Sequence, residues 1–199
     1  AMPARQAMHS EDDRGKLLLM PANLPAEHRM GVKVVSLFEN NATLGLPRLH
    51  ALMLLFDGTT GRPLAVIEGA ALTAVRTGAA SGAATDLLAR PDAETVAILG
   101  AGVQGRTQLE AVCAVRTIRR VWVFDPDTKV LEEFCREMSR ALQTPVVAAK
   151  SAQSAVRQAR IICTATSSSS PVLADADVKS GTHINAVGSY RPDVQEIPL

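Results

Sequence analysis

The stretch TVAILGAGVQG, from Thr95 to Gly105, decides the fold of this chain. Its first half is apolar and rich in β-branched residues, which favours a buried strand over Thr95–Leu99. Its second half contains a G-x-G-x-x-G pattern, and a helix is expected to begin near Val103. A strand, a glycine turn and a helix in direct succession are typical of the first unit of a Rossmann-type, doubly wound parallel sheet.

Each glycine of this pattern has a separate expected task. Gly100 makes the tight turn, Gly102 lets the backbone approach a pyrophosphate, and Gly105 lets the helix pack on its strand. The N-terminus of the helix then offers free N–H groups to phosphate oxygens. The alternative is a glycine turn that binds nothing, but the preceding strand and an acidic residue after the next strand both favour a dinucleotide site.

That acidic residue is Asp125, which ends the expected strand Val121–Phe124 and lies twenty positions after Gly105. A carboxylate at this place can accept hydrogen bonds from the hydroxyls of the adenosine ribose. No arginine follows it, because the next residues are Pro126 and Asp127. A 2′-phosphate would meet two negative charges, so NAD is the expected cofactor and NADP the alternative.

The alternation of strands and helices continues as far as residue 187. This order predicts an α/β architecture with a doubly wound parallel sheet over residues 93–199. The domain is expected to be incomplete at its C-terminus, since another strand or two should follow, so the chain is interpreted as a fragment of a longer protein. The expected elements are strands at 95–99, 121–124, 146–148, 161–165 and 183–187, and helices at 103–115, 128–142 and 152–159.

Residues 1–92 have a different texture, in which turn signals separate short apolar runs. We expect a partial antiparallel α+β domain here, whose last helix connects it to the parallel sheet. The first thirty residues show no clean periodicity, and Met20–Pro25 is interpreted as a strand end followed by a turn. The expected elements are strands at 31–38, 51–56 and 63–67, a turn at Asp57–Gly61, and a helix at 69–90 that Pro91 stops.

The 199 residues carry 21 Lys and Arg against 20 Asp and Glu, a formal net charge of +1. This balance gives no electrostatic footprint for nucleic acid or an anionic membrane, so neither partner is expected. No apolar run approaches the roughly 18 residues of a membrane span, and the first residues lack the apolar core of a signal peptide. Cys113, Cys135 and Cys163 are too scattered for a disulfide framework or a zinc site. We therefore expect a cytoplasmic protein without a metal.

Several stretches of the chain together match a known family, namely Pro3–Arg5, Leu19–Ala22, Gly31–Val35, Asp57–Ala65, Leu72–Ala79, Ile98–Gln104 and His183–Gly188. Through these stretches the chain resembles the ornithine cyclodeaminase/mu-crystallin family. Its members include ornithine cyclodeaminase, an archaeal alanine dehydrogenase, cyclic imine (ketimine) reductases and mammalian mu-crystallin. The resemblance implies a homodimer that pairs through residues 1–92, the substrate-binding and dimerisation domain.

The resemblance implies a substrate pocket that contains several cations. Arg5, Lys33 and Arg76 match its substrate positions, where a guanidinium can hold a carboxylate in a bidentate fork. Lys33 would also be the catalytic residue, which supplies a proton to nitrogen when a hydride reaches the neighbouring carbon. On spacing alone, Lys33 would instead be a solvated strand lysine and Arg76 a salt-bridged helix arginine. Arg48 stands where the family often has Thr or Ser, and either holds a second acidic group of the substrate or faces solvent.

The resemblance also implies the cofactor contacts. The pyrophosphate turn includes Val103 and Gln104, and the carboxyl ends of later strands fall near the nicotinamide. For Thr166, a loop hydroxyl that bonds its own backbone is an equal alternative. The residues expected to bind the cofactor are Gly100, Gly102, Val103, Gln104, Gly105, Asp125, Thr166, Asn185, Ala186, Val187 and Gly188.

One departure from the family pattern bears on the reaction. Tyr190 stands where true ornithine cyclodeaminases carry a catalytic Asp, and the run Tyr190–Asp193 is closer to the pyrroline-carboxylate and ketimine reductases. The resemblance therefore favours NAD(P)H-dependent reduction of a small cyclic imine or α-imino acid, similar to pyrroline-2-carboxylate, to the amino acid. The alternatives are ornithine cyclodeaminase proper, which forms proline and ammonia with bound NAD, and a non-catalytic ligand-binding protein similar to mu-crystallin. A nucleotide-sensing regulatory domain would leave Arg5, Lys33 and Arg76 unexplained.

Overall fold

The computed structural model describes residues 3–12, 14–189 and 194–198, and it divides into two compact units, Ala1–Thr73 and Ala74–Leu199. The division falls inside one helix, α1 (Gly69–Leu88). We expected a border between residues 92 and 93, which assigns the whole helix to the first domain. That border remains a prediction about the functional domains, because a compact unit and a functional domain need not end at the same residue.

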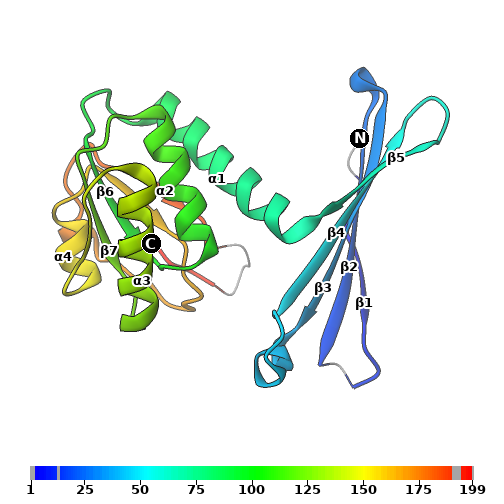
Figure 1. Cartoon of the computed structure of the whole chain (residues 1–199), viewed down its shortest axis with the longest axis horizontal. Coiled ribbons are helices and arrows are strands. Elements are labelled where there is room, and N and C mark those ends of the chain that lie inside the picture. The colour runs from blue at the N-terminus through cyan, green and yellow to red at the C-terminus, as the bar shows by residue number, and fades with distance from the viewer. Residues whose placement is uncertain (1–2, 13, 190–193, 199) are drawn as a thin grey trace. The chain divides into compact units, whose positions relative to one another are not determined.

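The first unit is a five-stranded antiparallel sheet in the order β1-β2-β3-β4-β5 (Figure 1). The predicted hairpin between β4 and β5 is confirmed, and the Asp57 carboxylate accepts hydrogen bonds from the N–H groups of Thr59 and Thr60 in its turn. The strands are β1 Gln6–His9, β2 Gly15–Leu24, β3 Arg29–Phe38, β4 Leu49–Asp57 and β5 Pro63–Glu68, with 3-10 turns η1 Pro25–Glu27 and η2 Glu39–Leu44.

Two strands lie where the sequence showed no clean periodicity. The expected strand end near Met20 is wrong, because β2 continues to Leu24 and the turn begins only at Pro25. Pro21 therefore lies inside a strand. It is tolerated there because β1 pairs only with Lys16–Leu19, so within the described residues β2 is an edge strand beyond Leu19 on that side.

The two faces of this sheet differ. Leu18, Val35 and Ala51 form the buried cluster of one face, and the strand register places Lys33 on that same face. On the opposite face, Leu52 and Val66 keep 50% and 68% of their surface exposed. A sheet of this kind is buried on one side only.

The second unit is a five-stranded parallel sheet in the order β10-β9-β6-β7-β8. Its first strand, β6, has later strands on both sides, so the order reverses between β6 and β9. The predicted doubly wound fold is confirmed, although the expected helix at 152–159 already ends at Val156. The further elements are β6 Thr95–Leu99, α2 Val103–Val115, β7 Arg120–Phe124, α3 Thr128–Leu142, β8 Val146–Ala148, α4 Ala152–Val156, β9 Ile161–Thr164, η3 Asp175–Asp177 and β10 His183–Ala186.

Alternate residues of the parallel strands pack into two separate cores. Ile98 of β6 lies in one cluster with Leu109 of α2 and Phe134 of α3. Its neighbour Leu99 lies in the other cluster with Val156 of α4. Both faces of the sheet are thus covered, as a parallel sheet requires (Figure 1). Of the helices described, none has the length and apolar character needed to cross a membrane.

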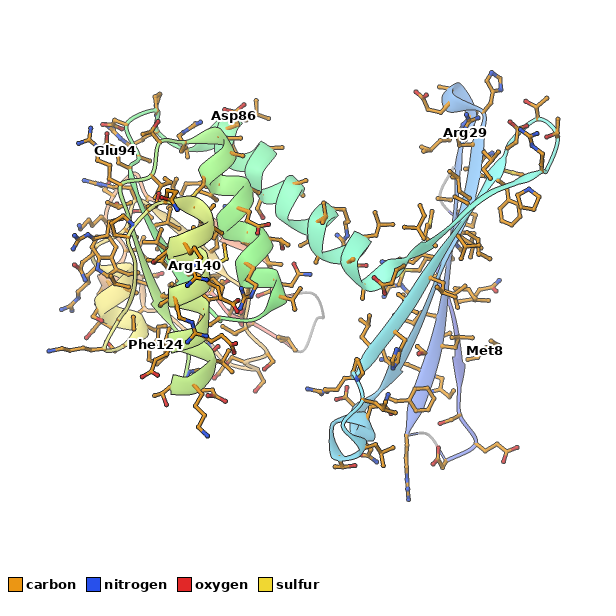
Figure 2. The ribbon with its side chains drawn as sticks, in the orientation of Figure 1. Met8, Arg29, Asp86, Glu94, Phe124 and Arg140 are labelled. Carbon is orange, nitrogen blue, oxygen red and sulfur yellow. The ribbon has the colours of Figure 1, made fainter. Side chains whose placement is uncertain are left out.

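The guanidinium of Arg116 binds the end of α1 within the second unit. Arg116 donates hydrogen bonds to the carbonyl oxygens of Thr85, Asp86, Ala89 and Arg90 at 2.9–3.3 Å, and it forms an ion pair with the Asp86 carboxylate at 3.0 Å. The carbonyls of Thr85 and Arg90 also accept the N–H groups of Ala89 and Ala93, so Arg116 adds a second donor there, and it supplies a side-chain donor to the carbonyls of Asp86 and Ala89. Figure 2 labels Asp86 beside the end of this helix. Only 10% of the Arg116 side chain is exposed.

Candidate functional site

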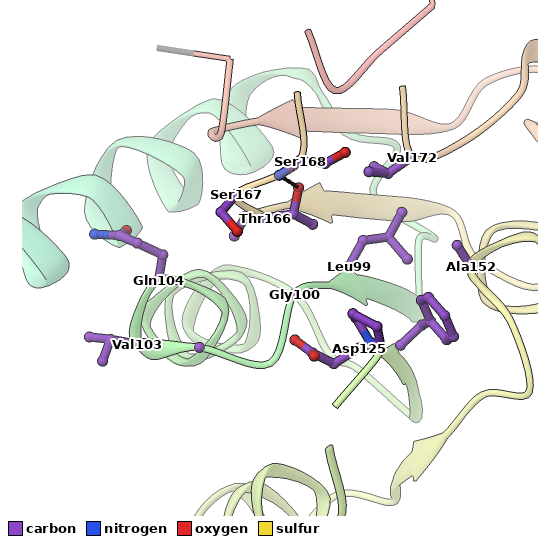
Figure 3. Close-up of a pocket in the computed structure, with 14 residues that line it drawn as sticks. Leu99, Gly100, Val103, Gln104, Asp125, Ala152, Thr166, Ser167, Ser168 and Val172 are labelled. Atoms are coloured by element: carbon purple, nitrogen blue, oxygen red, sulfur yellow. Dashed lines mark hydrogen bonds between the residues drawn. The ribbon is translucent and has the colours of Figure 1, made fainter. Parts of the chain in front are cut away.

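A cavity of about 680 Å³ opens at the carboxyl ends of β6, β7 and β9 (Figure 3). It lies where the strand order reverses, which is where open α/β sheets bind their ligands. Its lining comes from the turn after β6, the end of β7, the start of α4 and the loop after β9. The lining residues are Leu99, Gly100, Gly102, Val103, Gln104, Phe124, Asp125, Pro126, Ala152, Ala165, Thr166, Ser167, Ser168 and Val172.

The turn between β6 and α2 requires glycine at two positions. Gly100 has a φ of +101°, and a Cβ on it would lie 2.5 Å from the carbonyl oxygen of Ala165. A Cβ on Gly105 would overlap the Gly100 carbonyl and lie 3.2 Å from Cγ2 of Ile98. A side chain at Gly105 would push α2 away from β6, and one at Gly100 would push the turn away from the loop after β9. The two glycines therefore keep the start of the helix at the cavity.

The start of α2 is open toward the cavity. Gly102 is the N-cap residue and lines the cavity, and a Cβ on it would meet nothing within 4 Å. In the described part of the chain, no side chain caps this helix, so none competes for its first N–H groups. Val103 and Gln104 follow as its first two residues. This combination of accessible main-chain donors and open space fits a pyrophosphate.

Asp125 is held in place by two main-chain groups. Its Oδ2 accepts the N–H of Ala101 at 2.8 Å, and its Oδ1 accepts the N–H of Asp127 at 2.9 Å. Each carboxylate oxygen can accept a second hydrogen bond, so both keep an acceptor site for ribose hydroxyls. The Asp127 carboxylate caps α3 through the N–H groups of Lys129 and Val130, which places a second negative charge close to the first.

Thr166 lines the opposite side of the cavity, and a carboxylate that the sequence analysis missed holds it. The hydroxyl and the N–H of Thr166 both donate to Oε1 of Glu196, at 2.5 and 2.7 Å. Oε2 of Glu196 accepts the hydroxyl of Thr164 at 2.8 Å and the N–H of Gly188 at 2.6 Å. Glu196 is fully buried. Glu196 belongs to no sequence motif, and an isolated glutamate in a sequence is normally expected at the protein surface.

Asn185 makes its contacts away from the cavity. Its Nδ2 donates to Oγ1 of Thr85 in α1 at 3.0 Å and lies 3.6 Å from Sγ of Cys163. Nε2 of His183 lies 3.1 Å from its Oδ1. This buried chain of polar groups ties β10 to α1, and Asn185 is not among the residues that line the cavity.

The three residues after Asn185 are also absent from the lining of the cavity. Ala186 is exposed, and Val187 donates its N–H to the carbonyl of Thr164 at 2.9 Å, which extends the pairing of β10 with β9. Gly188 is buried, and a Cβ on it would overlap the carboxyl group of Glu196. A cofactor contact for Asn185, Ala186, Val187 and Gly188 remains a prediction.

The cations expected to bind substrate lie on different elements. Lys33 is partly buried in β3, and its Nζ donates to Oγ1 of Thr73 at 3.5 Å. Arg76 is exposed three residues beyond Thr73 in α1. Arg5 is exposed in the segment before β1. The roles assigned to these side chains remain predictions.

Arg48, the fourth of these cations, forms an ion pair with Glu39 at the start of η2. The two side chains are 59% and 68% exposed. The run Tyr190–Asp193, which bears on the reaction, lies outside the described residues.

The thiols are free and shielded. Burial raises the pKa of Cys113 and of Cys135 to about 11, and that of Cys163 to about 12. They are therefore protonated at neutral pH and are poor nucleophiles. In the ranges 3–12, 14–189 and 194–198, no group of His, Cys, Asp and Glu is placed to hold a metal ion.

The sequence and the fold of this chain are similar to those of known proteins. The sequence model of the ornithine cyclodeaminase/mu-crystallin family matches residues 1–198. The Delta(1)-pyrroline-2-carboxylate reductase of Bacillus cereus is 37% identical over 196 residues, which are 98% of this chain and 60% of that protein.

Two solved structures have the same fold over nearly the whole chain. One is Thermococcus litoralis Delta(1)-pyrroline-2-carboxylate reductase in complex with NADH and L-proline, with a TM-score of 0.91 and 43% identity, over 99% of this chain and 61% of that one. The other is an archaeal alanine dehydrogenase dimer with bound NAD, with a TM-score of 0.90 and 35% identity, over 100% of this chain and 60% of that one. This chain thus spans about 60% of the length of these relatives.

Proposed function

The chain belongs to the ornithine cyclodeaminase/mu-crystallin family, and on this premise we propose that it acts as an NAD(P)H-dependent reductase of a small cyclic imine or α-imino acid. The substrate would resemble pyrroline-2-carboxylate, and the product would be the amino acid. The observation that carries the proposal is the cavity of the second unit. It is lined by the start of α2, which has no side-chain cap, and by the carboxylate of Asp125, which the N–H of Ala101 holds in place. The reaction named for the Bacillus and Thermococcus relatives supports the choice of chemistry.

We propose NAD as the cofactor. The start of α2 would hold the pyrophosphate, Asp125 the adenosine ribose, and the loop with Thr166 the nicotinamide side. The two adjacent carboxylates of Asp125 and Asp127 disfavour a 2′-phosphate, and Asp125→Asn should lower the preference for NADH over NADPH about tenfold. A reduced nicotinamide, when bound, supplies the hydride for the imine carbon.

Reduction of a carbon–nitrogen double bond also requires a proton at nitrogen. We assign this proton to Nζ of Lys33, which is a donor on a partly buried strand. The hydrogen bond to Thr73 restrains the ammonium at the start of α1. This hydrogen bond distinguishes Lys33 from a strand lysine whose ammonium contacts only solvent.

The carboxylate of the substrate would bind to the guanidinium groups of Arg5 and Arg76. Both are exposed, so their donors are accessible to a ligand. Arg48 already pairs with Glu39, which supports the interpretation that it stabilises its own loop rather than a second acidic group.

The proposal includes a homodimer and a cytoplasmic location. The exposed apolar face of the first sheet, with Leu52 and Val66, is the surface that a second copy would cover. The archaeal alanine dehydrogenase, which is described as a dimer, supports the oligomeric state. Free cysteines are consistent with a reducing compartment.

The test follows NADH and NADPH absorbance with 1-pyrroline-2-carboxylate in the full-length protein, and assays proline formation from ornithine in parallel. Net cofactor oxidation with the imine, lost in Lys33→Ala and retained in Lys16→Ala, is the expected result. Lys16 is a suitable control because it is another lysine on the same face of the sheet. Proline and ammonia from ornithine without net cofactor change would contradict the proposal and indicate a cyclodeaminase. Nucleotide binding without either activity would indicate a binding protein.

A further inference from the structure

A cluster of hydrogen bonds surrounds the buried carboxylate of Glu196, a residue that belongs to none of the expected motifs. Four donors occupy it, namely the hydroxyls of Thr164 and Thr166 and the N–H groups of Thr166 and Gly188, at 2.5–2.8 Å. An ionised carboxylate has about four lone-pair sites and no hydrogen to donate, so its capacity matches this set of partners. The side chain is fully buried, so these donors take the place of water.

Glu196 connects parts of the chain that border the cavity. Its carboxylate binds Thr166, and its main-chain carbonyl accepts the N–H of Val172 at 2.9 Å; both partners line the cavity. Its own N–H donates to the hydroxyl of Ser189 at 2.9 Å, after β10. The lack of a side chain at Gly188 is explained by the same carboxylate, which a Cβ there would overlap.

The hydrogen bonds of Thr166 determine what its hydroxyl can offer to a ligand. A hydroxyl has one hydrogen and two lone pairs. The hydrogen is donated to Oε1 of Glu196 at 2.5 Å, and one lone pair accepts the N–H of Ser168 at 3.1 Å. Within the part of the chain that the structure describes, one lone pair of this hydroxyl remains for the cavity, so the hydroxyl can accept a hydrogen bond there but cannot donate one.

We propose that Glu196 is a positioning residue of the cofactor site, which fixes Thr166 as a hydrogen-bond acceptor toward the nicotinamide half of the dinucleotide. The inference rests on the proposed function. Thr166 follows β9, across the switch point from Asp125, and the two mononucleotide halves of a dinucleotide bind on the two sides of that point. The ligand groups that suit an acceptor are the carboxamide NH₂ and the hydroxyls of the second ribose.

The experiment compares the dissociation constants of NADH and ADP by calorimetry in the full-length protein. ADP contains only the adenosine and pyrophosphate part of the cofactor, which would contact Asp125 and the start of α2. Glu196→Gln keeps the size of the side chain but directs an NH₂ group at other donors. It should weaken NADH about tenfold and change ADP binding less than about twofold, since mismatched buried donors cost roughly one order of magnitude in binding.

Further variants distinguish a positioning role from general destabilisation. Ser139→Ala removes hydrogen bonds between α3 and β8 away from the cavity, and it should leave the ratio of the two dissociation constants unchanged. Thr166→Val should weaken NADH as Glu196→Gln does, whereas Thr166→Ser should retain wild-type binding. The double variant Glu196→Gln with Thr166→Val should be no weaker than either single one, because both remove the same contact.

Three results would overturn the inference. Equal weakening of NADH and ADP by Glu196→Gln would indicate a merely structural carboxylate. Additive effects in the double variant would show that Glu196 does not act through Thr166. A wild-type protein that binds neither ligand would contradict the proposed function itself, and this result is distinct from the other two because it needs no variant.

Discussion

The two units of this chain bury their sheets in different ways. In the second unit, Ile98 and Leu99 of one strand are both almost completely buried, each against its own layer of helices and loops. In the first unit, one face has a small buried cluster around Val35, while Leu52 on the other face is 50% exposed. The unit that contains the cavity therefore has two cores of its own, whereas the antiparallel sheet leaves an apolar face exposed.

The largest effect is expected from Gly100→Ala in the second unit. The positive φ and the nearby Ala165 carbonyl leave no place for a Cβ, so the turn must shift. We expect a loss of about 3 kcal/mol in unfolding free energy and at least about a hundredfold weaker NADH binding. Gly102→Ala is the matched control, because its Cβ would meet open space, and it should preserve stability while it hinders the pyrophosphate. Unchanged stability of Gly100→Ala would contradict the strained turn.

The next largest effect is expected from Arg116, whose guanidinium binds the end of α1 in the same unit. Arg116→Ala leaves the last carbonyls of α1 without their buried donor, and we expect a loss of about 3 kcal/mol in urea unfolding. Arg119→Ala breaks an exposed ion pair with Glu94 and should cost less than about 0.5 kcal/mol. Similar losses in both variants would mean that the buried hydrogen bonds contribute no more than a surface pair.

The first unit is tested on its exposed face. Leu52→Lys places a charge on the apolar surface that a second copy would cover, and it should weaken dimerisation by about 2 kcal/mol in sedimentation experiments. Leu87→Lys changes another exposed leucine, on α1, and should leave the dimer intact. If Leu87→Lys dissociates the dimer and Leu52→Lys does not, the interface does not lie on this face of the sheet.

The smallest effect is a pH dependence at the start of α1. The carboxylate of Glu68 accepts the N–H groups of Ala71 and Ala70, and these hydrogen bonds lower its pKa from the ordinary value of 4.5. A lowered pKa in the folded state stabilises above pH 4.5, and this contribution is lost as the pH falls through the folded value. Thermal unfolding of Glu68→Gln should therefore be less sensitive to pH below 5 than that of the wild type, and an identical pH profile would contradict the cap.

The parallel sheet could be predicted because each of its elements carries a local signal. The bounds of β6 and α2 agree with expectation, since an apolar run, a glycine turn and a helical segment follow one another directly. β1 and the second half of β2 could not be predicted in this way. β1 is a short, exposed edge strand. In β2, Pro21 indicates the end of a strand, but the strand continues because β1 does not pair with β2 beyond Leu19.

Some residues of the candidate site could likewise be predicted from local patterns in the sequence, and others could not. Gly100, Gly102 and Asp125 were expected from their spacing, because the glycine turn and the carboxylate need only two neighbouring strands. The cofactor contact expected for Asn185 remains a prediction. What could not be predicted is the bond of its side chain to Thr85, which lies a hundred residues earlier in the chain. Such a contact leaves no periodic pattern in the sequence.

In the second unit, the order of strands and helices, the glycine turn and the carboxylate of Asp125 could be predicted from the amino-acid sequence, because each depends on residues close together in the chain. The contacts of Glu196 follow from the tertiary structure and not from any local pattern. The end of β9 with the loop after it, and Gly188 after β10, must converge on Glu196 before their hydroxyl and N–H donors can surround its carboxylate. A buried charge is stable only with such partners, and only the folded chain brings them together.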